Sequence, residues 1–150
     1  MYIEKLRGDF VILIGNDHAG YDVKKEIIEF LKEKNYDVKD YGCDNTDSVD
    51  FPDYAFKVCE SLTENDKAIL ICTTGIGMSI AANKVKGIRC AKVDNVDEAR
   101  LTRMHNDSNV LAISALKDIN EIKKIVLTFL ETPFSNEERH IRRISKINEY

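Results

Sequence analysis

The chain of 150 residues lacks a long apolar segment, paired cysteines and an excess of basic residues. No stretch approaches the roughly 20 apolar residues that a membrane-spanning helix needs. The opening residues carry charges where a signal peptide would have its apolar core, so we expect a cytoplasmic protein with no membrane partner. The formal net charge of -4 gives no general attraction to nucleic acid, which we therefore also exclude as a partner.

The four cysteines are not spaced as C-x-x-C or as any similar metal-binding pair. We therefore expect reduced thiols and no metal site. Internal repeats, linkers and low-complexity tracts are also missing, and the length is that of one ordinary domain. The sequence predicts a single domain over residues 1–150. The cysteines are Cys43, Cys59, Cys72 and Cys90.

Short apolar runs alternate with segments of helical periodicity along the chain. Strands are predicted at 10–14, 36–42, 68–72, 89–93 and 109–113, and a helix follows each of them. Ser135 and Glu138 have the spacing of a capping box, which predicts the start of a C-terminal helix. This alternation indicates an α/β protein with a three-layer, doubly wound, Rossmann-like fold around a five-stranded parallel sheet.

The segment ILICTTGIGMSIAANK, residues 69–84, places a glycine turn between a buried strand and a helix. Gly75 and Gly77 let the backbone approach a ligand, and the start of the helix offers N–H groups to an anion. A dinucleotide-binding fingerprint would need a small residue at Ile80, and a phosphate-binding loop would need a following Gly-Lys-Ser/Thr. The sequence has neither feature, so both of these motifs are excluded. A plain tight turn without a ligand is the alternative that remains.

Cys72 ends the same strand and directly precedes the turn. A thiol at the start of a helix is more easily deprotonated, so Cys72 could act as a base or nucleophile; a small core residue is the alternative. Asp17 and His18 follow the first predicted strand, where a histidine could bind an anion or transfer a proton, or simply be a solvated or capping side chain.

Two further candidates come from later helices. His105 lies near a helix end, where a positive charge is also favoured for structural reasons alone. Arg139 and Arg143 are four residues apart, so both could hold one phosphate, or could form an ordinary basic helix face. Ligands of parallel sheets bind at the carboxyl ends of the strands. We therefore expect all of these side chains at that edge of the sheet.

Five segments together resemble the B-type ribose-5-phosphate isomerase family, which includes galactose-6-phosphate and allose-6-phosphate isomerases. They are GNDHAGYDVKKEI, DFPDYA, ILICTTGIGMSIAANKVKGIR, RMHNDSNVLA and RHIRRI, and the likeness extends over residues 11–150. The resemblance implies interconversion of ribose 5-phosphate and ribulose 5-phosphate through an enediolate, without a metal or organic cofactor. It also implies a homodimer, or a dimer of dimers, with active sites shared between subunits.

By position, Cys72 matches the family's general base and His105 the histidine that opens the furanose ring. Thr74 matches a hydroxyl that moves protons between the two sugar oxygens. The catalytic residues implied in this way are Cys72, His105, Thr74 and Asp17, and the substrate-binding residues are His18, Thr73, Gly75, Ile76, Gly77, Asn106, Arg139 and Arg143.

The chain departs from the family pattern at several positions. Some members use a glutamate base where Met78 stands, so this chain resembles the members that use cysteine. The family usually has glycine at Thr73, arginine at Leu116 and tyrosine at Phe51. Threonine tolerates positive φ poorly, and the lost arginine would weaken phosphate binding unless Lys117 replaces it. An isomerase for another aldose phosphate, or a catalytically silent sugar-phosphate binder, therefore stays as an alternative.

Overall fold

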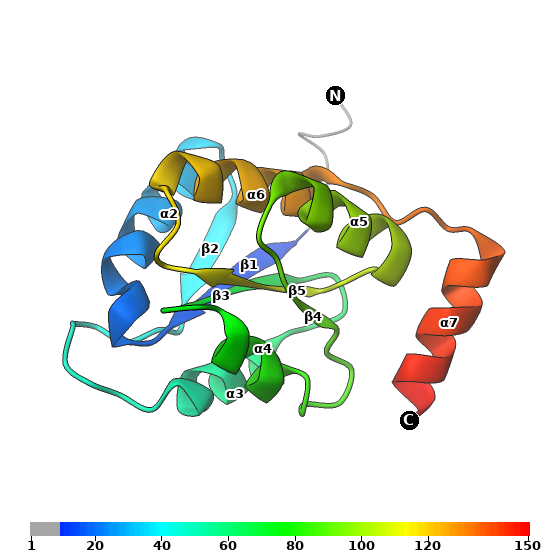
Figure 1. Ribbon diagram of the computed structural model, residues 1–150, viewed down its shortest axis with the longest axis horizontal. Coiled ribbons are helices and arrows are strands. Elements are labelled where there is room, and N and C mark those ends of the chain that lie inside the picture. Colours follow the sequence, from blue (N-terminus) through cyan, green and yellow to red (C-terminus); the bar gives the residue numbers. More distant parts are fainter. Residues whose placement is uncertain (1–9) are drawn as a thin grey trace.

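The computed structural model describes residues 10–150, which form a parallel sheet covered by helices on both faces (Figure 1). The sheet has five strands in the order β2-β1-β3-β5-β4. Its three central strands are almost fully buried, because their apolar runs are covered from both sides. The strands are β1 (Val11–Asn16), β2 (Asp37–Asp40), β3 (Lys67–Cys72), β4 (Cys90–Lys92) and β5 (Val110–Ser114).

The helices divide the interior into two cores. The 3-10 turn η1 (His18–Gly20) leads into α2 (Tyr21–Glu33), which covers one face of the sheet with α5 (Val96–Asn106) and α6 (Ile119–Glu131). The other face is covered by α3 (Phe51–Ser61) and α4 (Ile76–Ala82). The predicted α/β doubly wound fold is confirmed, with strand positions within about two residues of those expected from sequence.

Side chains alternate between the two cores along β3. Ile69 and Ile71 point to the α2, α5 and α6 side, whereas Leu70 and Cys72 point to the α3 and α4 side. Met78 of α4 is fully buried in that second core. Cys72 is the last residue of β3, and its side chain lies in the same core as Met78 of α4.

The last helix, α7 (Glu138–Glu149), stands beside the end of α5 and apart from the sheet (Figure 1). The predicted capping box is wrong, because the Ser135 hydroxyl is used differently. Its oxygen accepts a hydrogen bond from the Glu137 N–H at 3.2 Å and lies 2.6 Å from Nδ1 of His140. Among residues 10–150, no helix is both long and apolar enough to cross a membrane.

Candidate active site

The turn after β3 holds the Cys72 sulfur in a fixed position. The Gly75 N–H donates to Cys72 Sγ at 3.1 Å, and the cysteine is 5% exposed. Gly75 has φ of 81°, and an added Cβ would lie 2.9 Å from the carbonyl carbon of Ile113. The position therefore requires glycine for both its conformation and its space.

The two threonines of the turn are exposed beside this sulfur. The Thr73 carbonyl accepts from the Ser114 hydroxyl at 2.6 Å, and Thr74 Oγ1 accepts from the Ile76 N–H at 3.2 Å. Thr73 is not among the described non-glycine residues with positive φ, so the turn accommodates it without that strain. The Thr74 oxygen acts only as an acceptor in this bond, which leaves its hydroxyl proton to donate.

Asp17 and His18 lie next to this turn, at the end of the neighbouring strand β1. The Asp17 N–H donates to the Ile71 carbonyl at 3.2 Å, and its carboxylate accepts from the Gly20 N–H at 3.1 Å. His18 Nδ1 accepts from the Val49 N–H at 3.2 Å. A neutral His18 ring therefore carries its proton on Nε2.

His105 and Asn106 lie at the opposite edge of the sheet. They end α5, which runs back across the sheet and is followed by the start of β5. The Ala68 N–H donates to the Asn109 carbonyl at 2.9 Å, so this helix end is level with the beginning of β3. Cys72 is four residues farther along, or about 13 Å at the usual rise of a strand. The expectation that all candidate residues share one edge is therefore wrong.

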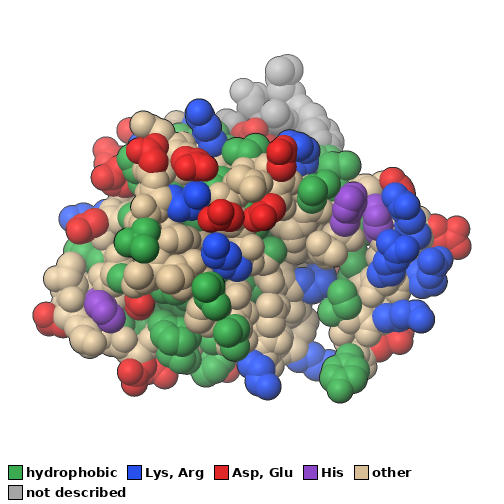
Figure 2. All heavy atoms as spheres, viewed as in Figure 1, with side chains coloured by type: hydrophobic (Ala, Val, Ile, Leu, Met, Phe, Trp, Pro, Cys, Tyr) green, Lys and Arg blue, Asp and Glu red, His purple; other side chains and the backbone are tan. Residues whose placement is uncertain are grey.

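Arg139 and Arg143 lie on α7, beside this same helix end. The ring of His140 on α7 is 4.5 Å from the ring of His105, centroid to centroid. Arg139 is exposed, and its Nε donates to the Glu137 carboxylate at 2.9 Å. The histidines consequently appear at two opposite ends of the molecule (Figure 2).

The candidate residues thus form two groups, one at each edge. The carboxyl-edge group contains Asp17, His18, Cys72, Thr73, Thr74, Gly75, Ile76 and Gly77. The amino-edge group contains His105, Asn106, Arg139 and Arg143. Within one chain the two groups do not meet.

Burial shifts the pKa of two thiols and of one histidine. Burial raises the pKa of Cys59 to about 12, and it also raises the pKa of Cys90, so neither thiol can serve as a base at neutral pH. Burial lowers the pKa of His140 below its ordinary value, and the neighbouring His105 lowers this pKa further. His140 therefore favours the neutral form.

Lys117 does not replace the arginine that the family resemblance implies at Leu116. Leu116 is 76% exposed, and the adjacent Lys117 pairs with Asp94 at 3.4 Å and with Glu121 at 3.7 Å. Lys117 is therefore engaged away from the turn. In the described part of the chain, no group of three or more His, Cys, Asp or Glu side chains is arranged to hold a metal ion.

Lys24, which no motif in the sequence indicated, supports the carboxyl edge. It is 2% exposed, and its Nζ donates to the Cys43 carbonyl and pairs with Asp40 at 3.2 Å. These bonds join α2 to residues 40–43. The chain continues from there to Val49, whose N–H donates to His18. The position of Lys24 on the same helical face as the buried Ile27 could have revealed it. Arg89 was also missed, and no local pattern distinguishes it.

Known proteins resemble this chain over nearly its whole length. Residues 12–147 match the Ribose/Galactose Isomerase family. A putative sugar phosphate isomerase of Bacillus subtilis, YwlF, is 47% identical, with 93% of this chain and 95% of that protein covered. Ribose-5-phosphate isomerase B of Escherichia coli is 40% identical, with 91% and 93% covered.

A solved structure agrees with these sequence relatives. Ribose-5-phosphate isomerase B of Clostridium thermocellum has a TM-score of 0.89 and 45% identity, covering 93% of this chain and 95% of that one. The fold and the sequence thus lead to the same group of proteins. The chain belongs to the ribose/galactose isomerase family.

Proposed function

We propose that the protein interconverts ribose 5-phosphate and ribulose 5-phosphate without a cofactor, with Cys72 as the general base. Membership of the family makes the chain an aldose–ketose isomerase. The choice of sugar is supported by the relatives from Escherichia coli and Clostridium thermocellum, both named as ribose-5-phosphate isomerases. The roles of individual residues rest on the geometry of the two edges.

The hydrogen bond from the Gly75 N–H to Cys72 Sγ carries the proposal. A donor that points at sulfur interacts more strongly with a thiolate than with a neutral thiol. The sulfur also lies beside two exposed threonines, at the edge where α/β sheets bind ligands. This combination suits a base that removes a proton from carbon.

The proposed chemistry moves one proton between adjacent carbons. The Cys72 thiolate takes the proton from C2 of the opened aldose. The released electron pair forms the C1–C2 double bond of the enediolate, and the π electrons of the C1 carbonyl move to O1, which becomes negative. Main-chain N–H groups of the turn from Thr73 to Gly77, other than the Gly75 and Ile76 groups already bonded to Cys72 and Thr74, stabilise the negative O1. The thiol then returns the proton to C1, while a proton passes from O2 to O1 with the help of Thr74. The product is the ketose.

Ring opening and phosphate binding need the amino-edge group, which one chain cannot bring to Cys72. We therefore propose a homodimer in which the partner's His105 faces Cys72 and the partner's Arg139 and Arg143 bind the phosphate. Exposed hydrophobic side chains on α4 are available for such an association, because Ile76 is 54% and Ile80 64% exposed. A dimer of dimers would repeat this arrangement.

The replacement of the family arginine by Leu116 favours one alternative, an isomerase for a longer aldose phosphate. An exposed leucine leaves the phosphate without one charged contact, which is worth about 1.5 to 3 kcal/mol. A six-carbon substrate such as galactose 6-phosphate or allose 6-phosphate would place its phosphate elsewhere. A silent sugar-phosphate binder is less favoured, because such a protein needs neither Cys72 nor His105.

Turnover of ribose 5-phosphate, followed by NMR or absorbance, tests the proposal. Cys72→Ala should lower kcat by about 10² to 10⁴, the usual contribution of a general base, with little change in KM. Cys90→Ala is the matched control and should keep full activity. Turnover that survives in Cys72→Ala would refute the assigned base. Wild-type binding without turnover would indicate the silent binder, and turnover only with a hexose phosphate would indicate the longer substrate.

A further inference from the structure

Helix α7 is joined to the rest of the molecule near both of its ends. Before its first turn, the Ser135 N–H donates to the Met104 carbonyl at 3.1 Å, and the His140 ring contacts His105. In its last turn, Asn148 is bonded to Arg89. A cavity of about 580 Å³ between α7 and the segment 83–88 is lined by Ile147, Asn148 and Tyr150. The bond between Asn148 and Arg89 therefore restrains the last turn of α7 beside this cavity.

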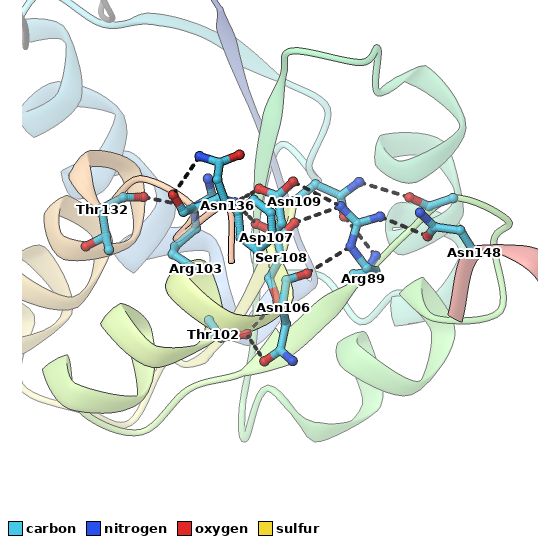
Figure 3. Close-up of polar contacts among 12 residues, drawn as sticks. Arg89, Thr102, Arg103, Asn106, Asp107, Ser108, Asn109, Thr132, Asn136 and Asn148 are labelled. Carbon is cyan, nitrogen blue, oxygen red and sulfur yellow. Dashed lines mark hydrogen bonds and ion pairs between the residues drawn. The ribbon is translucent and has the colours of Figure 1, made fainter. Parts of the chain in front are cut away.

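The Arg89 side chain donates three hydrogen bonds, two at the end of α5 and one to α7 (Figure 3). Its Nε donates to the Asn106 carbonyl at 3.0 Å, and its Nη2 donates to the Asp107 carbonyl at 2.8 Å. Its Nη1 donates to Asn148 Oδ1 at 3.0 Å. The side chain is 15% exposed, so these bonds are partly shielded from water. One planar guanidinium thus connects the end of α5 to the end of α7.

The arginine is itself held in place by its neighbours. Its N–H donates to Asn109 Oδ1 at 2.8 Å, and its carbonyl accepts from the Asn109 N–H at 3.1 Å. The carbonyls that it binds belong to a helix end, where they lack partners within the helix and favour a positive charge. A lysine has a single nitrogen and cannot reproduce the three directions of the fork.

We infer that Arg89 is a positioning residue that sets the distance between the ring-opening and phosphate-binding parts of the amino-edge group. This inference rests on the proposed function. Asn106 directly follows His105, while α7 carries Arg139 and Arg143. A substrate whose phosphate is held by α7 reaches His105 correctly only if α7 keeps its place beside α5. Small misplacements of reacting groups reduce rates strongly.

Two substitutions separate the two connections that Arg89 makes. Asn148→Ala removes only the link to α7, so KM for ribose 5-phosphate should rise about three- to tenfold at nearly constant kcat. Arg89→Met also releases the α5 end, so kcat should fall as well, and Arg89→Lys should resemble it. Arg100→Met is the control and should change neither constant, because within residues 10–150 the exposed Arg100 pairs with Asp97, one turn away on α5.

Amide hydrogen exchange of residues 138–149, measured without any sugar, gives a readout independent of turnover. Exchange should be faster in Asn148→Ala and in Arg89→Met than in the wild type. Arg100→Met should exchange at the wild-type rate. All four proteins are compared in the same oligomeric state. Unchanged exchange would overturn the inference. Faster exchange with unchanged KM and kcat would also overturn it, because Arg89 would then be merely structural. A wild type inactive on every aldose phosphate would instead refute the proposed function, and exchange would still decide whether Arg89 holds α7.

Discussion

The two edges of the sheet hold their candidate residues by different means. At the carboxyl edge, the side chains of Cys72 and Asp17 accept hydrogen bonds from main-chain N–H groups three residues further along the chain. At the amino edge, the end of α5 is held by side chains. Arg103 donates to the Asp107 carboxylate at 2.9 Å and to the Ser108 carbonyl at 2.7 Å, while Arg89 binds the other side of the same turn.

This difference matches the chemistry proposed for each edge. Main-chain donors after a strand are rigid and suit a base and a developing oxyanion, which must be positioned closely. Side chains of arginine and histidine project farther from a helix than main-chain groups do. They therefore suit the phosphate and the ring oxygen of a bound sugar. Under the proposed function, each edge lacks what the other supplies, and a complete isomerase site needs both.

The largest expected effect comes from filling the carboxyl-edge turn. Gly75→Ala should lower the free energy of unfolding by about 2 to 5 kcal/mol, because it adds left-handed strain to a clash with the Ile113 main chain. Gly87→Ala is the matched comparison, since φ is 86° there but nothing lies within 4 Å of the added Cβ. It should cost about 1 kcal/mol, from strain alone. Urea unfolding measures both, and equal losses would contradict a space requirement at Gly75.

A smaller effect is expected from the cations of the amino edge. Arg143→Ala should raise KM for the phosphorylated sugar about tenfold or more, since a charged hydrogen bond to phosphate is worth about 1.5 to 3 kcal/mol. Arg142→Ala removes an adjacent charge that is outside the candidate site and should leave KM nearly unchanged. Steady-state kinetics distinguish the two. If KM is the same in both variants, the α7 arginines are only a solvated face.

The smallest effect concerns pH and His140. Its pKa is lowered in the folded protein, so the unfolded chain binds the proton more readily. The stability that this neutral histidine contributes is present above the ordinary histidine pKa of about 6.5 and is lost as pH falls below it. Denaturant midpoints at about pH 8 and about pH 5 should differ less in His140→Gln than in wild type. An equal or larger difference in the variant would contradict the lowered pKa.

The sequence predicted the carboxyl edge well because its determinants are local. Continuous apolar runs mark the buried strands, and the residues that follow each strand necessarily lie at that edge. The glycine requirement at Gly75 was also visible. Thr73 was uncertain only because its φ depends on how the turn packs against Ser114.

The amino edge was predicted less well, for two different reasons. The position of His105 follows from the predicted topology itself, since a crossover helix must return to the start of the next strand. The roles of Arg89 and Ser135 depend on contacts that no local pattern contains. Arg89 bonds to Asn148, far along the chain, and the Ser135 hydroxyl is taken by His140 instead of capping α7.

Complementation between two inactive variants tests the shared site most directly. Cys72→Ala and His105→Ala are each expected to be nearly inactive when expressed alone. When they are coexpressed, a mixed dimer has one site with both substitutions and one site with neither. If each site takes Cys72 from one chain and His105 from the other, random pairing restores about a quarter of the wild-type sites. Activity that stays at the level of the separate variants would contradict a site built from two chains.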